Sequence, residues 1–385
     1  MAVARRSSAR FSLSLSIALL ATATFAPDAG AADASGADAG NAKVIFRAEP
    51  TTELARIPVT NWQEAWPALL ASCTVIDAAG AAHRSAWHEV CVDAARVDAK
   101  SGDAIRAWIL RRMSSYRVYS EQGAANGARA HETDAGFMTG YYEPVLQGSR
   151  ERSDEFPAPI YGAPEQIPKL ARADLDAMGL LRGHEILWLR NPLDAFFLEV
   201  QGSGRVRLRD GSWIRIAYAA NNGQPYRSIG HWLVEQGQLA RDDVSMQTIR
   251  DWVKAHPERR QDLFDENPRV VFFRQVPLAD PLAGPDGSLG VALTPGVSVA
   301  VDRRFLPLGA PLLVRSFPKQ ADGRAVAGPY RLMVAQDTGG GIVGPLRLDC
   351  FQGTGDAAGE IAGRQHERAE IRLLVPKGTA PESLL

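Results

Sequence analysis

The segment that most constrains the fold of this chain lies near the C-terminus, where two short apolar stretches flank a turn rich in glycine. It reads RLMVAQDTGGGIVGPLRLDCFQGTG from Arg331, and it places Asp337 before the turn and Asp349 after it. Residues of a strand alternate between two faces, and consecutive glycines allow a tight reversal of the chain. The segment therefore predicts a rigid β scaffold that holds two carboxylates close together, an arrangement typical of a catalytic centre.

A third acid, Asp302, follows the alternating apolar stretch VSVAV and precedes two arginines. Its carboxylate is predicted to pair with the backbone or with Arg303 or Arg304. Asp337 also has a structural interpretation, because an aspartate before Thr-Gly commonly holds a turn by accepting backbone hydrogen bonds. At this point a catalytic role and a turn-holding role are both open for Asp337.

Several further motifs occur in order upstream of these aspartates. They are FMTGYYEPVLQGS from Phe137, PIYGAP from Pro159, FFLEVQGSGRVRL from Phe196 and YAANNGQPYRSIG from Tyr218. Together with VAVD, AQDTGG and RLD, they resemble the landmarks of the MltA-type lytic murein transglycosylases over roughly residues 135 to 375. The resemblance implies a double-psi β-barrel with three aspartates, a second β domain inserted into it, and a groove for a glycan strand between the two. The expected fold class is mainly β with N-terminal helices, that is, α+β.

The resemblance also implies a discontinuous domain order. The expected parts are a signal peptide at 1–31, a flexible lead at 32–42, a barrel domain at 43–142 and 271–375, an inserted β domain at 143–270, and a tail at 376–385. Without the resemblance, the sequence would place a single boundary near residue 135, where helical periodicity gives way to short alternating stretches.

The N-terminus reads as a secretory signal peptide, because three arginines precede an apolar stretch and small residues follow at Ala29 and Ala31. Its removal would move the net charge from -1 to about -3, which disfavours electrostatic binding of nucleic acid. The string LASC at 70–73 matches a lipoprotein cleavage box, but it lies in a helical pattern far from the signal peptide. We therefore expect an exported, soluble periplasmic protein. The outer-membrane association of lipid-anchored relatives has no N-terminal lipobox cysteine to support it here.

Export also changes how the cysteines are interpreted, since disulfides persist on the oxidising side of the membrane. Cys73 and Cys91 lie on two successive predicted helices with a short loop between them. We predict a disulfide between them, with two buried free thiols as the alternative. Cys350 is predicted to be a core-facing strand residue.

Helical spacing of apolar residues predicts three helices between residues 62 and 113, and serine caps predict two more after Ser228 and Ser245. From Phe137 onward, short alternating stretches bounded by Gly, Pro and Asn predict strands. These stretches are EILWLR from Glu185, AFFLEVQGSGRVRLRDG from Ala195, SWIRIAYAA from Ser212 and VVFFRQV from Val270.

Cleavage of a glycosidic bond requires a proton for the leaving oxygen, and a carboxylic acid supplies it when burial or a nearby negative charge keeps it neutral. Asp349 fits this description, since it ends an apolar stretch beside Asp337. By resemblance, Asp349 is the acid and then the base for the C6 hydroxyl of N-acetylmuramic acid, which gives a 1,6-anhydromuramoyl product without water. Asp337 would orient Asp349 or bind the sugar.

The resemblance implies further residues that bind the sugar: Tyr142, Glu143, Gln201, Ser203 and Asp302. Strand packing is the alternative for Tyr142, since only alternate residues of a strand face one side. Glu143 has an alternative as well, because it could be the second carboxylate of a true glycoside hydrolase.

The predicted activity is cleavage of the β-1,4 bond between N-acetylmuramic acid and N-acetylglucosamine in peptidoglycan, without cofactor or metal. The rivals are a non-catalytic wall-binding or wall-loosening barrel and a two-carboxylate hydrolase. A G-x-G-x-x-G match at 339–344 precedes a strand instead of a helix, which argues against dinucleotide binding. A single Asp-Thr-Gly does not supply the aspartate pair of an aspartic protease. The expected partners are glycan strands and a cell-wall synthase or scaffold complex, and the resemblance favours a monomer.

Overall fold

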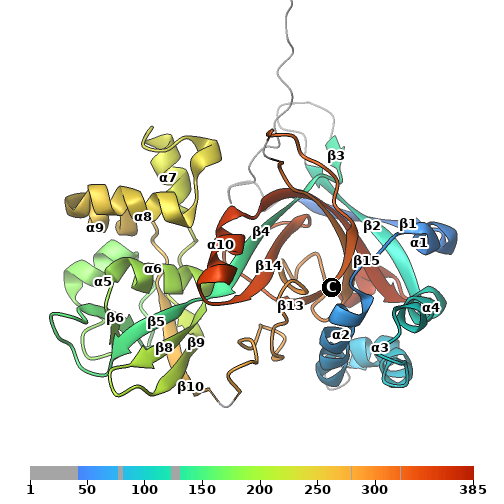
Figure 1. The fold of residues 1–385 in the computed structure, drawn as a ribbon, viewed down its shortest axis with the longest axis horizontal. Coiled ribbons are helices and arrows are strands. Elements are labelled where there is room, and N and C mark those ends of the chain that lie inside the picture. Colours follow the sequence, from blue (N-terminus) through green and yellow to red (C-terminus); the bar gives the residue numbers. More distant parts are fainter. Residues whose placement is uncertain (1–41, 77–80, 123–130, 279, 321) are drawn as a thin grey trace, which may run out of the picture. The chain divides into compact units, whose positions relative to one another are not determined.

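The computed structural model describes residues 42–76, 81–122, 131–278, 280–320 and 322–385 (Figure 1). The predicted signal peptide and all but the last residue of the predicted flexible lead lie outside these described residues. Within the described ranges, no helix has both the length and the apolar character that crossing a bilayer would require.

The α-helices cluster before residue 113 and recur in small groups later. They are α1 (Thr51–Arg56), α2 (Trp62–Ile76), α3 (Ala81–Ala94), α4 (Gly102–Arg112), α5 (Arg172–Met178), α6 (Pro192–Gln201), α7 (Ile229–Glu235), α8 (Met246–Ala255), α9 (Arg260–Asp265) and α10 (Asp356–Arg364). The predicted caps are confirmed, since the side chains of Ser228 and Ser245 accept hydrogen bonds from the first turns of α7 and α8.

The strands form two sheets. They are β1 (Lys43–Glu49), β2 (Met113–Gln122), β3 (His131–Thr133), β4 (Gly136–Glu143), β5 (Val145–Ser149), β6 (Ala158–Tyr161), β7 (Glu185–Leu189), β8 (Ser203–Leu208), β9 (Trp213–Asn221), β10 (Val271–Pro277), β11 (Ser298–Val301), β12 (Pro311–Phe317), β13 (Tyr330–Asp337), β14 (Arg347–Thr354) and β15 (His366–Pro376). The expected class, mainly β with N-terminal helices, is confirmed.

The first sheet closes on itself. Its order is β1-β2-β15-β12-β13-β11-β14-β4, and β4 pairs again with β15, so that six strands from β15 round to β4 form a ring (Figure 1). Two pairings in this ring are parallel, β11 with β13 and β14 with β4. Closure leaves these six strands without a free edge, as in a barrel.

The second sheet has the order β10-β9-β8-β5-β7-β6. The chain enters it from the ring through Pro144 alone, because β4 ends at Glu143 and β5 begins at Val145. It leaves after β10, which pairs with β9 along residues 271–277. The sheet pairing thus extends past residue 270, where the family resemblance placed the end of the inserted domain, because the strand VVFFRQV hydrogen-bonds within the second sheet.

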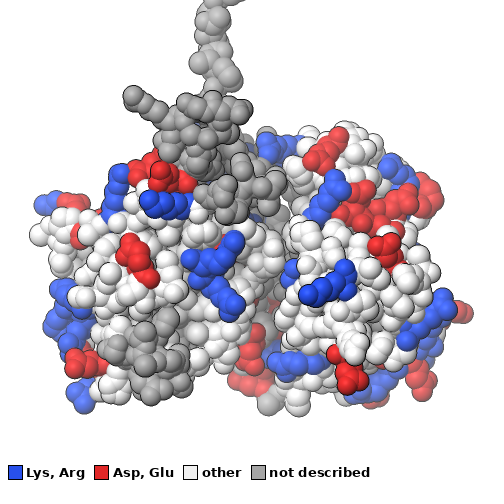
Figure 2. Space-filling view, turned by 180° about the vertical axis from the view of Figure 1, so that it is seen from behind, with Lys and Arg blue, Asp and Glu red and all other residues white. Residues whose placement is uncertain are grey.

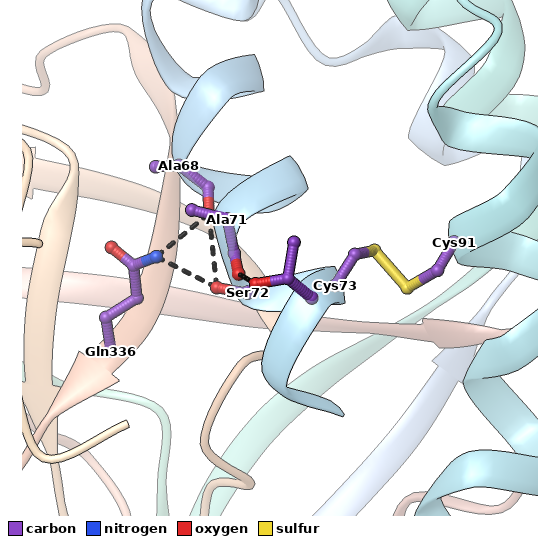
Figure 3. The surroundings of a disulfide bond; sticks show 7 residues. Ala68, Ala71, Ser72, Cys73, Cys91 and Gln336 are labelled. Atoms are coloured by element: carbon purple, nitrogen blue, oxygen red, sulfur yellow. Dashed lines mark hydrogen bonds between the residues drawn. A yellow bond between two sulfur atoms is a disulfide. The ribbon is translucent and has the colours of Figure 1, made fainter. Parts of the chain in front are cut away.

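One apolar core joins the N-terminal helices to the ring. It contains Trp66 and Trp108, whose rings meet edge to face at a centroid distance of 5.0 Å, together with apolar residues of β11 to β15. The predicted disulfide is confirmed: Cys73 on α2 and Cys91 on α3 are bonded, with their Cα atoms 5.4 Å apart (Figure 3). LASC at 70–73 lies within α2, and Cys350 is a buried free thiol on β14, both as predicted.

The stretch AFFLEVQ was wrongly predicted as a strand and is part of α6. The Asn191 side chain caps the helix by accepting a hydrogen bond from the Leu193 N–H at 2.9 Å, and Gly202 ends it with a φ of 79°. Separate apolar clusters cover the helix, with Phe196 in one and Leu198 in the other. A continuous apolar run suits a helix buried on two sides as well as a strand, and periodicity alone does not separate the two.

Charged side chains of both signs are interspersed over the face shown in Figure 2, in small groups of Lys and Arg or of Asp and Glu. This agrees with a formal net charge of -1 for the whole chain. A single-sign field of the kind that draws a protein to a polyanion does not cover this face.

Candidate active site

Strand β11 brings Asp337 and Asp349 to either side of one small residue. Ala300 pairs with Asp337 of β13 in parallel register and with Asp349 of β14 in antiparallel register. A register shift between Val299 and Ala300 advances the β13 pairing by one residue, from Ala335 directly to Asp337. Such shifts re-aim side chains near functional sites. The two carboxylates named from the sequence are therefore neighbours across a single strand.

Asp349 has few hydrogen-bond donors around it. The Thr139 hydroxyl, on β4, donates to Oδ1 of Asp349 at 2.6 Å, and Arg347 donates to the same hydroxyl oxygen at 2.9 Å. Burial raises the pKa of Asp349 to about 6, helped by the negative charge of Asp337 and opposed by Arg347 and the Thr139 hydrogen bond. This carboxyl group is therefore partly protonated near neutral pH, as a general acid must be.

Asp337 has four donors on its two oxygens. The Ser288 N–H and hydroxyl and the Thr338 N–H donate to Oδ1 at 2.8 to 2.9 Å, and the Tyr141 hydroxyl donates to Oδ2 at 2.7 Å. The backbone bond from Thr338 is the turn-holding contact that the sequence suggested. Both of its oxygens are thus occupied, in contrast to Asp349.

Asp302 is held by its own turn. Arg304 donates to both carboxylate oxygens at 2.9 and 2.6 Å, and the N–H groups of Arg304 and Gly344 add 3.1 and 2.8 Å bonds. Burial acts to raise the pKa of Asp302, but these donors outweigh it and the pKa is lowered. The predicted pairing with Arg304 is confirmed. Asp302 ties the turn after β11 to the glycine loop at Gly344, which leaves it little capacity to bind a sugar.

Glu143 lies in a buried ion-pair cluster and not on a groove surface. Its side chain is 0% exposed, with Arg205 and Arg215 at 2.7 and 2.6 Å and the Thr354 hydroxyl at 2.9 Å. The two arginines also donate to the carbonyl oxygens of Pro281 and Ala283, on the chain that returns from the second sheet. The expectation that Glu143 binds sugar is at odds with this placement, because no face of the carboxylate reaches solvent.

Tyr142 and Gln201 meet each other at the start of the second sheet. The Gln201 side-chain oxygen accepts a hydrogen bond from the Tyr142 N–H at 2.9 Å. The Tyr142 ring is buried against Gly359 of α10, where an added Cβ would lie 2.8 Å from it. Ser203 is buried at the start of β8, where it pairs with Ala217. Of these three predicted residues, Gln201 alone lines a pocket.

That pocket has a volume of about 180 Å³ and lies beside the strand that carries Thr139. Its lining residues are Gly140, Phe197, Val200, Gln201, Tyr226, Ser228, Ile229, Gly230, Val244, Ser245, Met246, Ile249, Ala362 and Gly363. Burial raises the pKa of Tyr226, and the negative charge of Asp349 contributes. Tyr226 also abuts the glycine loop, where a Cβ on Gly341 would lie 3.0 Å from its ring. A larger pocket of about 460 Å³, lined by residues of α1, α2 and α4, contains none of the predicted site residues.

Metal chemistry has no donor set in the part of the chain that the structure describes. No group of three or more His, Cys, Asp or Glu residues lies together there in a way that could hold a metal ion.

Sequence reasoning missed the residues that set the properties of the two aspartates. They are Thr139, Tyr141, Ser288, Arg347 and Tyr226. Alternation along β4 could have placed Thr139 and Tyr141 on one face, but their pairing with Asp349 and Phe351 of β14 depends on a parallel register that the sequence does not encode locally. Ser288 reaches Asp337 from a loop 49 residues away.

Known proteins resemble this chain over most of the region described above. Two family models match it, the MltA specific insert domain over residues 137–274 and the 3D domain over residues 297–375. The membrane-bound lytic murein transglycosylase A of Escherichia coli K12 is 39% identical over 242 residues, which are 62% of this chain and 65% of that relative. The chain thus matches just under two thirds of the length of that curated relative.

Solved structures match more of the chain. The lytic transglycosylase LtgG of Burkholderia pseudomallei is 36% identical, with a TM-score of 0.54, and the match covers 88% of this chain and 98% of that one. A structure of E. coli MltA with bound chitohexaose is 28% identical, with a TM-score of 0.63, and the match covers 86% of this chain and 93% of that one.

Proposed function

This chain belongs to the MltA family of lytic transglycosylases, and from that premise we propose that it cleaves the β-1,4 bond between N-acetylmuramic acid and N-acetylglucosamine in peptidoglycan. The product carries a 1,6-anhydromuramoyl end. Asp349 is the acid and then the base, and no cofactor takes part.

One observation carries this proposal: Asp349 is a partly buried carboxyl group whose pKa desolvation raises to about 6, with a single side-chain donor, Thr139, on one oxygen. A group of this kind holds a proton near neutral pH and can release it to a leaving oxygen. Neither Asp337 nor Asp302 has this environment, because four hydrogen bonds occupy the oxygens of each.

The reaction proceeds in two proton transfers through the same group. The Asp349 carboxyl gives its proton to the glycosidic oxygen as the bond from that oxygen to C1 of N-acetylmuramic acid breaks, and positive charge develops at C1. The C6 hydroxyl of the same sugar then attacks C1 and gives its proton to the Asp349 carboxylate. The acid is thereby regenerated, and no water is consumed. The negative charge of Asp337, across β11, favours the protonated starting form of Asp349.

The surroundings of the pocket support a glycan as the substrate. Gln201 offers an amide and Tyr226 an aromatic ring beside Asp349, and such groups suit the polar edges and apolar faces of sugars. The relative with bound chitohexaose is a member of the same family. We infer that a strand of peptidoglycan passes between the ring and the second sheet, over the ends of β4 and β14.

Two rivals have less support. A two-carboxylate hydrolase would need a second free carboxylate, yet Glu143 is closed between two arginines. A wall-binding barrel without activity would have no need for an acid with a raised pKa. Such groups cluster at catalytic sites.

We also propose domain boundaries, a cellular location and an oligomeric state. We propose a barrel domain formed by residues 43–142 and the strands from β11 to the end of β15, with the second sheet as the inserted domain, because the pairings divide in this way. Since its curated relatives are named membrane-bound, we place the protein in the cell envelope. We propose that it acts as an exported periplasmic monomer, alone or with a cell-wall synthase or scaffold.

The test is mass spectrometry of the fragments that the wild-type protein and the Asp349→Asn variant release from purified peptidoglycan. We expect fragments ending in 1,6-anhydromuramic acid from the wild type and none from the variant. Reducing-end sugars from the wild type would mean a hydrolase. Binding to the wall without fragments from either protein would mean a binding module.

A further inference from the structure

Tyr141 contacts one of the two aspartates and lies near the other. Its hydroxyl donates to Oδ2 of Asp337 at 2.7 Å, across the two strands that separate β4 from β13. Its ring packs on Phe351, with centroids 5.4 Å apart, and belongs to the same buried cluster as Ala300. Tyr141 therefore crosses the face on which Ala300 separates the two acids.

The ring of Tyr141 lies within reach of both charges. Burial raises the pKa of Tyr141 well above its ordinary value, and the charges of Asp337 and Asp349 both contribute. The side chain is 8% exposed, so the hydroxyl proton has little access to water and stays on the bond to Asp337. A phenol that is buried in this way is a fixed donor and not a proton carrier.

We propose that Tyr141 is a positioning residue for the reaction: it holds Asp337 by Oδ2 and so sets how strongly the Asp337 charge acts on the acid, Asp349. The proposal rests on the proposed function, because it concerns the acid of that reaction. Tyr141 itself neither gives nor takes a proton.

The groups that face the two acids come from five parts of the chain. Around Asp349 they are Arg347 and Cys350 on β14, Thr139 and Tyr141 on β4, Asp337 on β13, and Tyr226 before α7. Around Asp337 they are Tyr141, Asp349, Ser288 and Thr338. Among these groups, Tyr141 interacts with both aspartates from a strand that carries neither of them.

Opposite pH shifts are expected from two substitutions. Tyr141→Phe removes a donor from Asp337 and leaves its charge less compensated, so the pKa of Asp349 rises. Asp337→Asn removes the charge, so the pKa of Asp349 falls. Because the lost hydrogen bond is to Asp337, the pKa of Asp349 is expected to move by less than the roughly 0.5 to 1 expected for loss of a bond to Asp349 itself. In the double variant the effect of Tyr141→Phe on the pKa of Asp349 should become small, because the Asp337 charge that the Tyr141 hydroxyl compensates is gone.

The experiment is the pH profile of kcat/KM for release of anhydromuramoyl fragments, measured for the wild type, both single variants and the double variant. A 13C NMR titration of the Asp349 carboxyl group gives the same pKa without requiring activity. Tyr330→Phe is the matched control, because Tyr330 is equally buried and its hydroxyl donates to another carboxylate, Glu370, at 3.2 Å.

The limb of the profile along which activity falls as Asp349 loses its proton is the quantity to compare. Tyr141→Phe should move this limb to higher pH, Asp337→Asn should move it to lower pH, and Tyr330→Phe should leave it in place. An unchanged limb in Tyr141→Phe, with an active wild type, would overturn this inference alone. The same shift from Tyr141→Phe in the presence and absence of Asp337 would also overturn it. An Asp349→Asn variant that still forms anhydro products would instead overturn the proposed function.

Discussion

A threonine hydroxyl donates to a carboxylate at two places between the neighbouring strands β4 and β14, and the two carboxylates have different roles. At one end, Thr139 of β4 donates to Asp349 of β14, and at the other end Thr354 of β14 donates to Glu143 of β4. The two sites are five residues apart along β14, or roughly 16 Å. Glu143 is fully buried and Asp349 is partly buried, yet the partly buried one is the raised-pKa acid and the fully buried one is an ion-pair centre.

The difference lies in the cations. Glu143 is in direct contact with the guanidinium groups of Arg205 and Arg215, whereas Arg347 donates to the Thr139 hydroxyl and acts on Asp349 through its charge. A buried carboxylate with direct cationic partners stays charged and holds segments together. One that lacks them is held neutral by burial, and this creates an acid. The cations in direct contact with a carboxylate, and not its strand or its burial, therefore decide between a structural and a catalytic role.

The largest expected effect is a difference in catalytic activity between substitutions of Asp349 and of Glu143. Asp349→Asn should lower kcat by on the order of 10³-fold, because asparagine has no proton to donate. Glu143→Gln, measured on folded protein, should retain anhydromuramoyl products with a loss in kcat below about tenfold. Turnover of purified glycan strands checks both variants. A comparable loss from Glu143→Gln in well-folded protein would mean that Glu143 is the second carboxylate of a hydrolase.

The second test measures stability, for which substitution of Glu143 is expected to have the larger effect. Glu143→Gln should lower the free energy of unfolding by about 3–5 kcal/mol, since it leaves two guanidinium groups buried without their carboxylate. Replacing Glu143, Arg205 and Arg215 together by methionine should recover much of this loss. Urea denaturation measures the change. Glu53→Gln, which breaks an exposed pair with Arg56, is the control and should change stability by under about 1 kcal/mol.

A smaller effect is expected from Asp349→Asn, which should stabilise the protein instead of destabilising it. The folded pKa of Asp349, about 6, is above the unfolded value, so its protonation contributes stability that is fully present below about pH 4 and lost as the pH rises through about 6. Asp349→Asn should therefore stabilise the protein at pH 8 by roughly 1–2 kcal/mol and change little at pH 4. Thermal denaturation at the two pH values checks this; a destabilised variant at pH 8 would contradict it.

The smallest expected effects come from the two threonines. Thr139→Val removes a hydrogen bond that lowers the pKa of Asp349, so this pKa should rise by roughly 0.5 to 1. The pH at which activity falls, as Asp349 loses its proton, should rise by the same amount. Thr354→Val serves as the matched control, since it lies at the Glu143 end. Equal shifts from both variants would show that the change comes from strand packing and not from the hydrogen bond.

Local sequence determined much of this protein. Helical spacing and serine caps located α2, α7 and α8, and the Gly-rich turn located the ends of β13 and β14. The order of the family motifs, and not a physical argument from the residues alone, identified Asp349 as the acid. The error at α6 arose because Phe196 and Leu198 face separate cores, which produces an apolar run that does not alternate.

Only the tertiary structure decided what each carboxylate does. Asp302, Asp337 and Glu143 lie at or just after strand ends, and Asp349 lies near the start of β14. Nothing next to them in sequence shows whether Asp349 or Glu143 is the acid. Arg205, Arg215 and Ser288 come from 49 to 72 residues away, and Thr139 comes from 210 residues away. The protonation and role of a buried acid depend on the charges and donors within a few ångströms of it. Closure of the ring and the parallel register of β4 and β14 bring those groups together, and so the fold selects the acid.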